Sequence, residues 1–320
     1  MKDKLLRGIK LILPFITIAL SVFLYYGVSD NGKQKQMDHP YYLYLIAIIG
    51  AVILIEIIVG LFVVSIRRRV LDKAPFFTGL IVFLLLINFV TTKTLLLPTL
   101  YFPSLDRIFG LIVEERVFLI KNVFDSLKLL TVGFAWGASI GFLTGLMLGY
   151  FKKVGYWLNP IIKVIGPIPT TAWIPLALST FPSTYGANVF LIAFAVWFPV
   201  ALMTSSGIQS TNNVHFEVSR TLGASTLYQI IHVAIPAAMP SIFLGVFYGT
   251  VSSFATLMAV EMNGNASGIG WYINWQKSVM LYNGVYAGLI IIAALCSIIL
   301  TILFKVRDRI LVWQKGVIKW

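Results

Sequence analysis

Long apolar runs separated by shorter polar segments dominate this chain. Each run approaches the ~20 residues that an α-helix needs to cross a lipid bilayer. Because no run alternates with the period of two that strands show, the pattern predicts an all-α integral membrane protein. About eight spans are expected, at residues 11–28, 42–66, 76–96, 127–150, 167–183, 187–206, 236–260 and 284–304.

One long polar segment, residues 207–235, lies between the sixth and seventh spans. Residues 217–222 are predicted to form a short helix, and Gly223 permits a backbone turn that a side chain would oppose. Ser225 is the expected N-cap of a second short helix that runs to Val233. The segment therefore predicts a helix–turn–helix on the membrane surface, held at both ends by spanning helices.

Composition and charge add an orientation. Of the 320 residues, 58% are hydrophobic and 12% are charged, which is more apolar surface than a soluble domain hides. With a cytoplasmic N-terminus, 17 of the 25 lysines and arginines fall in cytoplasmic segments; the other eight are Lys33, Lys35, Lys93, Arg107, Arg116, Lys121, Lys128 and Lys277. Because positive charge concentrates on the cytoplasmic side, both termini and the polar segment are predicted there. The net charge of +13 is therefore not a nucleic-acid footprint.

The sequence indicates no catalytic or cofactor site. His39, His215 and His232 lack the spacing of metal ligands, and Cys296 is a lone cysteine inside an apolar run. The sequence contains no Gly-x4-Gly-Lys-Ser/Thr phosphate loop. We therefore expect no catalytic residue, metal or cofactor in this chain.

The polar segment carries the most specific motif. Glu217-Val-Ser-Arg-Thr-Leu-Gly223, nine residues and Val233-Ala-Ile-Pro236 resemble the coupling loop of ABC importer permeases. The family pattern is Glu-Ala-Ala, three residues, Gly, nine residues and Ile-x-Leu-Pro, so every anchor is in register. The paired alanines are Val218 and Ser219 here, and Ile and Leu are Val233 and Ile235. The resemblance implies that an ATPase contacts Glu217, Arg220, Gly223, Ala224, Val233 and Pro236.

Further segments resemble the branch of these permeases that serves nitrate, taurine and aliphatic sulfonates. They are Phe102-Pro-Ser-Leu-Asp-Arg-Ile108, Leu158-Asn-Pro160, Gly166-Pro-Ile-Pro169, Ala259-Val-Glu261-Met262 and Ala266-Ser-Gly-Ile-Gly270. The chain departs from the branch at Thr170, where a second proline is usual, and at Gly166, where an arginine is usual. The resemblance covers residues 76–316 and implies the transmembrane domain of a type I ABC importer.

Residues 1–75 have no counterpart in the basic form of that branch and are predicted to form an extra N-terminal transmembrane hairpin. The basic start and apolar run of residues 2–28 are also features of a secretory signal peptide. No small-x-small cleavage site follows, and the run is long enough to span. We therefore expect a retained helix.

The resemblance also implies partners and a setting. Expected partners are a cytosolic ABC ATPase dimer that binds ATP and Mg, a second permease copy or close relative, and an extracytoplasmic solute-binding protein. The expected location is the plasma membrane of a prokaryote, with several passes. The solute is a sulfonate, a nitrate-like anion or a vitamin-type compound, and nucleic acid is not an expected partner.

Two sets of residues are structural or path candidates. Glycines at every fourth position of the fourth span form one stripe that lets another helix approach closely, and they are Gly133, Gly137, Gly141, Gly145 and Gly149. Pro169, Pro175 and Pro199 break helices at membrane depth, which is tolerated where backbone lines a cavity. Glu261 is expected either to line that path, to brace its outer gate, or to reach water from a helix end.

A different function stays open at this point. Glu56 lies in the middle of an apolar span, where a carboxylate is costly and often functional. A proton-coupled secondary transporter or channel would use Glu56 and Glu261, whereas the ordinary interpretation of Glu56 is a hydrogen-bonded contact between helices. Residues 104–121 are predicted as an amphipathic helix at the membrane interface, with Ser104 as its cap.

Overall fold

The computed structural model describes residues 2–32, 38–94 and 96–313, and within these ranges every regular element is helical. Seven of the described helices are long and apolar enough to cross a membrane, and one bent pair makes an eighth candidate. The predicted all-α membrane fold is therefore confirmed. The chain forms two compact units, one of Met1–Arg116 with Gln276–Ala287 and one of Val117–Trp275 with Gly288–Trp320.

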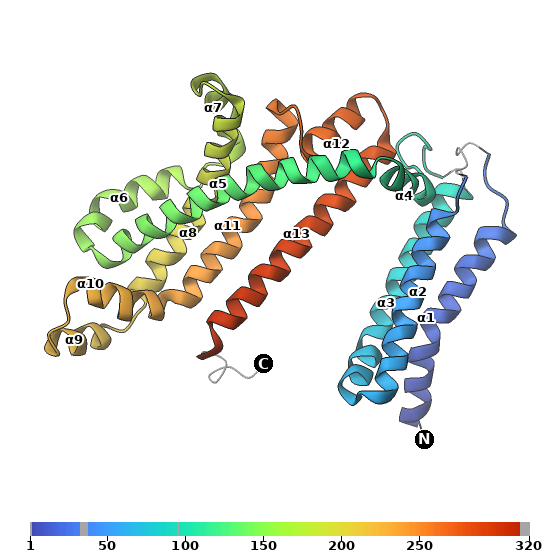
Figure 1. Ribbon diagram of the computed structural model, residues 1–320, viewed down its shortest axis with the longest axis horizontal. Helices are drawn as coiled ribbons and strands as arrows, with labels where there is room; N and C mark the ends of the chain where they lie inside the picture. Colours follow the sequence, from blue (N-terminus) through green and yellow to red (C-terminus); the bar gives the residue numbers. More distant parts are fainter. Residues whose placement is uncertain (1, 33–37, 95, 314–320) are drawn as a thin grey trace. The chain divides into compact units, whose positions relative to one another are not determined.

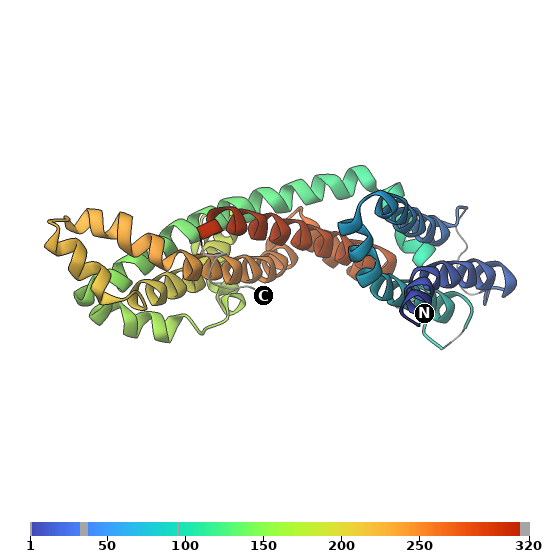
Figure 2. The same cartoon turned by 90° about the horizontal axis from the view of Figure 1, so that it is seen from below.

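The first unit is a helical bundle. Its elements are α1 (Lys2–Gly27), α2 (Tyr41–Phe62), α3 (Val64–Thr92) and the short α4 (Leu105–Glu114). Helices α1, α2 and α3 lie side by side (Figure 1), as the view from below also shows (Figure 2). Their shared interior contains Tyr42, Ile46, Ile53, Ile81, Leu105 and Ile108.

Two span limits in this unit differ from the prediction. Helix α2 ends at Phe62 instead of residue 66, because Val63 is extended (φ −123°, ψ 109°), and α3 begins at once. The basic run 67–69 was expected in a loop but is helical, since arginine is a good helix former. Residue 75, the expected end of the extra hairpin, therefore falls inside α3, and the separate role of that hairpin stays a prediction.

The second unit contains the remaining long helices. They are α5 (Arg116–Tyr150), α8 (Thr184–Gln209), α11 (Ile235–Gly264) and most of α13 (Tyr282–Ile310). Helices α8 and α11 pack closely along their lengths (Figure 1). This approach depends on a missing side chain, because a Cβ on Gly245 would lie 3.1 Å from the Pro199 carbonyl oxygen. The short α12 (Ile269–Ser278) begins in this unit.

The expected fifth span is a bent segment. Helix α6 (Lys152–Ile165) is followed by the short turns η1 (Thr170–Trp173) and α7 (Ile174–Thr180), and the two parts meet at 86°. A span over 167–183 was therefore wrong in its limits, although the break was expected. Pro167 and Pro169 lack the N–H groups that would continue α6, so the helix ends before them.

The predicted interfacial helix 104–121 is divided into two. Helix α4 ends at Glu114, and α5 begins at Arg116 and continues through the expected fourth span. The Ser104 hydroxyl accepts the Arg107 N–H at 3.4 Å, so the expected cap is confirmed. The amphipathic character therefore belongs to α4 alone.

Candidate functional site

The polar segment folds into a surface structure that we call the elbow, residues 213–234. It consists of α9 (Asn213–Thr221), α10 (Thr226–Gln229) and the π-helical turn η2 (Ile230–Ala234). The Ser225 hydroxyl accepts the Tyr228 N–H at 3.3 Å, as expected of an N-cap. Gly223 has φ +81°, a conformation that residues with a side chain rarely adopt. A cap and a glycine therefore fix the turn between α9 and α10.

The second half of the elbow differs from the prediction. A separate helix ending at Val233 was expected, but helical structure runs without a break from Thr226 to Gly264. Pro236 lies in the first turn of α11, where it cannot donate to residue 232 and its ring would crowd that carbonyl. The wider π turn that precedes it accommodates the ring without ending the helix.

The elbow is anchored to the spanning helices by aromatic and amide contacts. Phe216 of α9 packs against the cluster around Ile208 and Ala234, and its ring centroid is 6.0 Å from that of Tyr150. Gln229 is 3% exposed; its carbonyl oxygen accepts the Tyr150 hydroxyl at 3.0 Å, and its amide donates to the Ala224 carbonyl at 3.2 Å. The elbow therefore sits firmly at the end of α5, α8 and α11.

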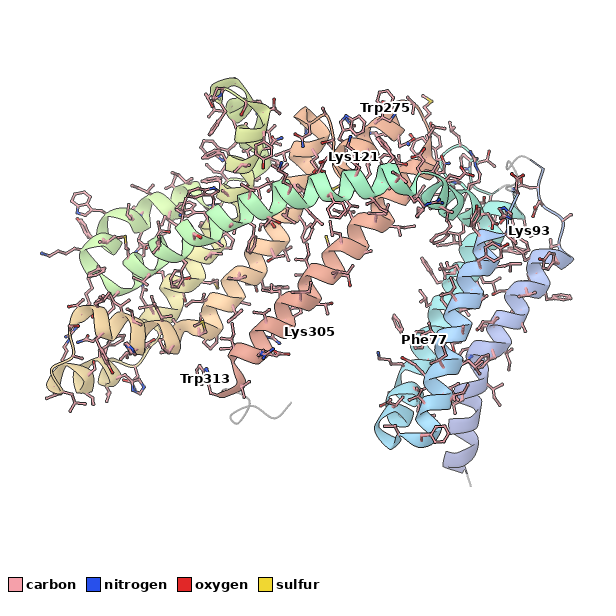
Figure 3. All side chains as sticks on the ribbon, viewed as in Figure 1. Phe77, Lys93, Lys121, Trp275, Lys305 and Trp313 are labelled. Carbon is pink, nitrogen blue, oxygen red and sulfur yellow. The ribbon has the colours of Figure 1, made fainter. Side chains whose placement is uncertain are left out.

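The opposite face of the elbow is open. Glu217 and Arg220 are exposed on α9, and Leu222 is 82% exposed beside the turn. A groove of about 670 Å³ lies alongside and is lined by His215, Val218, Ser219, Leu222, His232, Val233, Pro236, Ala237 and Trp313. Figure 3 shows Trp313 just beyond the end of α13. The structure thus brings the six expected contact residues together in the elbow and the first turn of α11.

The five glycines of the α5 stripe all face α8. A Cβ on Gly141 would lie 2.8 Å from the Trp197 carbonyl oxygen, and one on Gly145 would lie 2.5 Å from that of Ala201. Gly133, Gly137 and Gly149 are equally close to α8. A Cβ atom essentially never lies within 3.0 Å of an atom in a non-neighbouring residue, so glycine is the residue that fits at these five positions.

A second groove, of about 470 Å³, lies where the bent segment meets α8 and α11. We call it the bend groove; its lining includes Pro169, Phe194, Phe198 and Pro199, together with the hydroxyl side chains Thr170, Thr171, Ser252 and Thr256. These hydroxyls make no hydrogen bond within the described part of the chain, whereas Thr144 and Thr250 each donate to the carbonyl four residues earlier. The bend groove therefore offers free polar groups in an apolar setting.

Two other path candidates, Pro175 and Glu261, lie outside the lining of the bend groove. Pro175 is in the first turn of α7, outside the lining of the bend groove. Glu261 is 1% exposed: its Oε1 accepts the Ser126 hydroxyl and its Oε2 the Gly270 N–H, both at 2.7 Å. The Ser126 oxygen in turn accepts the Ile269 N–H at 2.8 Å. Glu261 is thus buried as a link between α5 and the turn before α12.

Glu56 lies in α2 within the first unit. It is half-buried, and its Oε2 is enclosed without a hydrogen-bond partner among the described residues. This oxygen therefore does not form the hydrogen bond between helices that was expected of the Glu56 carboxylate. No group of three or more acidic, histidine or cysteine residues with metal-binding geometry occurs in the described ranges.

This architecture has known relatives. The family of binding-protein-dependent transport system inner membrane components matches residues 137–312, more than half of the chain. The chain belongs to this family. The predicted membership is therefore confirmed, and the elbow and both grooves lie within or next to the matched region of this permease.

Individual relatives match more than half of the permease. A protein of Methanocaldococcus jannaschii named as an ABC transporter permease is 31% identical over 62% of this chain and 74% of its own length. SsuC of Bacillus subtilis, named as an aliphatic sulfonates transport permease, is 30% identical over 58% and 67%. The nitrate import permease NrtB of Synechocystis is 33% identical over 54% and 61%. The similarity to the nitrate and sulfonate branch is therefore confirmed.

Solved structures show the same fold. The inward-facing methionine ABC transporter MetNI contains a chain that superposes with a TM-score of 0.53 at 18% identity, over 62% of this chain and 98% of that one. A chain of an amino acid ABC transporter superposes with a TM-score of 0.51 at 22% identity, over 62% and 95%. The transmembrane domain of an ABC importer is thus the fold of this permease.

Several residues of the site escaped sequence reasoning. Tyr150 and Gln229 are hydrogen-bonded although they are 79 positions apart in the sequence, and Ser126 and Glu261 are hydrogen-bonded at a separation of 135. No local sequence pattern therefore pairs them. The only sign of these residues in the sequence was a polar side chain within an apolar span, a feature that Ser252 and Thr256 of the bend groove share. Isolated polar residues in the spans were therefore the useful markers of the site.

Proposed function

We propose that this protein is the membrane-spanning permease subunit of an ATP-driven importer. Family membership and the ABC importer fold support this assignment. The carrying observation is the elbow, which is anchored by Phe216 and Gln229 yet exposes Glu217, Arg220 and Leu222. A rigid knob at the end of spanning helices is suited to receive motion from a soluble partner. A separate ATPase subunit hydrolyses the ATP.

The partner at the elbow is a cytosolic ABC ATPase dimer, which binds ATP and Mg. The exposed Leu222 and the groove beside it offer apolar contact area, and the charges of Glu217 and Arg220 add specificity. This arrangement requires the elbow, the N-terminus and the C-terminus to face the cytoplasm of a prokaryotic cell. The excess of lysine and arginine on that side supports the orientation.

The bend groove is the proposed solute path. Pro169 interrupts regular backbone there, and four free hydroxyls offer hydrogen bonds without a fixed charge. Pro199, which was expected to break a helix, lies within the continuous helix α8. An external binding protein delivers the solute, and a second permease copy or close relative completes the path. Nitrate and sulfonate relatives support an anionic solute of that type, with a vitamin-type compound as the other candidate.

The decisive experiment is co-purification of the ATPase with elbow variants. Gly223→Pro forces a φ near −65° on a residue at +81°, and Glu217→Ala removes an exposed charge. We expect Gly223→Pro to release the ATPase and Glu217→Ala to weaken the binding of the ATPase to the elbow. Gly32→Pro is the matched control, because Gly32 has φ +71° in a loop of the first unit and open space around it.

The opposite result is equally informative. If both elbow variants retain the ATPase and its solute-stimulated hydrolysis at the level of Gly32→Pro, the elbow is not the coupling element. Solute uptake driven by a proton gradient is then measured in a Glu56→Gln variant. This measurement tests the secondary-transport alternative, which requires that carboxylate.

A further inference from the structure

A third groove lies between α11 and α13, and its α11 residues are in the half of that helix next to the elbow. Its volume is about 200 Å³, and its lining consists of Pro240, Phe243, Leu244, Phe247, Leu303, Phe304 and Arg307. All but one of these residues are apolar, and both helices are candidate membrane spans. We call it the lipid-facing groove.

The groove is apolar along its length and has one guanidinium, that of Arg307, at one end. The rings of Phe247 and Phe304 stack across the groove with their centroids 5.4 Å apart. Phe304 is farther from the C-terminal end of α13 than Arg307 is. Arg307 lies one turn nearer that end, and its guanidinium carbon is 4.9 Å from the centroid of the Phe304 ring. A ligand that fits must therefore combine a hydrocarbon part with an anionic head.

The guanidinium is held in place with donors to spare. Asp308 Oδ1 accepts hydrogen bonds from Arg307 Nε at 3.0 Å and from Nη2 at 2.7 Å. A guanidinium carries five N–H groups, so Nη1 and one N–H of Nη2 remain for a further acceptor. The Arg307 side chain is 43% exposed, so these remaining N–H groups are accessible to a further acceptor.

We propose that the lipid-facing groove binds an anionic phospholipid, whose acyl chain lies along Phe243, Phe247 and Leu303 and whose phosphate contacts Arg307. Basic pockets between spanning helices favour anionic head groups, and arginine binds phosphate through two parallel hydrogen bonds. A second permease copy packed over the groove would have to supply acceptors for the spare N–H groups of Arg307, because unpaired buried donors are costly. A phosphate supplies such acceptors itself, so these N–H groups favour the lipid.

The test uses the purified full-length protein in detergent, titrated with phosphatidylglycerol or with phosphatidylcholine of the same acyl chains. Retained lipid is counted by native mass spectrometry, and the thermal midpoint is followed by size exclusion after heating. We expect phosphatidylglycerol alone to raise the midpoint. Arg307→Gln should weaken its binding about tenfold, the value of one charge-assisted hydrogen bond.

Two variants separate this site from general charge effects. Arg309→Gln is the matched control, because positions two apart on a helix do not face the same side. Leu303→Trp fills the groove and leaves Arg307 in place, so it should abolish retention of the lipid by shape alone. It also keeps the test decisive should Arg307→Gln fail to fold.

Three results would overturn the proposal. They are equal losses in Arg307→Gln and Arg309→Gln, retention of the lipid by Leu303→Trp, and equal binding of phosphatidylcholine by the unmodified protein. A disulfide-linked dimer of Leu244→Cys, made with Cys296→Ser, would show that a second copy covers the groove and would also exclude the lipid.

Discussion

Glycine governs helix contact in the unit built around α5, α8 and α11, and has little part in the bundle of α1 to α3. A Cβ added to Gly79 in α3 meets nothing within 4 Å, whereas one added to Gly141 in α5 lies 2.8 Å from a backbone oxygen of α8. The α5–α8 spacing is therefore set by main-chain atoms, which cannot adjust as side chains do. The N-terminal bundle has side chains between its helices and should tolerate more change.

Each region nevertheless has one buried carboxylate that ties a short segment to long helices. Asp106 accepts the Tyr42 N–H at 2.8 Å and the Tyr25 hydroxyl at 3.4 Å. Glu261 accepts two hydrogen bonds of 2.7 Å. The shorter bonds indicate the tighter link in the second unit.

The largest effect is expected from Gly141→Leu. The added side chain would collide with the α8 backbone, and overpacking of this kind costs about 3 kcal/mol or more. The measurement is the thermal midpoint of the purified protein. Gly79→Leu is the matched control in the first unit and should stay close to the unmodified protein. Equal losses in both variants would remove the distinction between the two regions.

Glu261→Ala comes next. It leaves the Gly270 N–H and the Ser126 hydroxyl without their acceptor in a buried site, which costs about 3 kcal/mol. Ser126→Ala removes only one of these bonds and should cost less. Hydrogen exchange at residues 268–270 reports the loosened turn directly. Unchanged protection of these amides in Glu261→Ala would contradict the role of Glu261 as a link.

Lys93→Met should have a smaller effect, confined to the first unit. Lys93 lies at the end of α3 (Figure 3); its ammonium donates to Asp30 and to the Tyr25 carbonyl, both at 2.7 Å, and to the Val28 carbonyl. A cation at the C-terminal end of α1 also complements the helix dipole, so its loss should cost about 2 kcal/mol. A double-mutant cycle with Asp30→Asn measures the ion pair. A coupling energy of zero would show that the carbonyl contacts alone matter.

The smallest effect is a pH dependence of the first unit. Burial raises the pKa of the Asp106 carboxyl, and so does Asp30, while the Tyr42 N–H, Tyr25 and Lys93 lower it only in part. The folded state therefore keeps this proton to higher pH than the unfolded chain. Its contribution to stability is full below the ordinary pKa of about 3.9 and is lost as pH rises through the folded pKa. Asp106→Asn should flatten this part of the profile; an unchanged profile would assign the titration to another group.

Local rules explain how much the sequence could predict. The capping serine at 225 and the turn at Gly223 depend on neighbouring residues, so they were predictable. The period of four placed the glycines on one face, although only the structure identifies α8 as their partner. The prolines predicted a break near residue 167, but an 86° bend depends on packing with α8 and α11.

The failures have physical causes as well. The run 67–69 was expected to lie between two spans, yet it is helical, because arginine favours helix and one extended residue, Val63, suffices to divide two helices. Of the roles expected for Glu261, only contact with water is contradicted, since its hydrogen-bond partner Ser126, distant in sequence, helps to bury it. Pairings across more than a hundred residues require a fold before they can be predicted.

The unbroken winding from Thr226 to Gly264 has a mechanical consequence. Because these 39 residues form continuous helical structure, a tilt of α10 is expected to move the far end of α11 as well. Helix α9 is joined differently, through the non-helical residues 210–212 on one side and Gly223 on the other. A push on the elbow should therefore reach α11 through continuous helix, whereas it reaches α8 mainly through the close packing of α8 against α11.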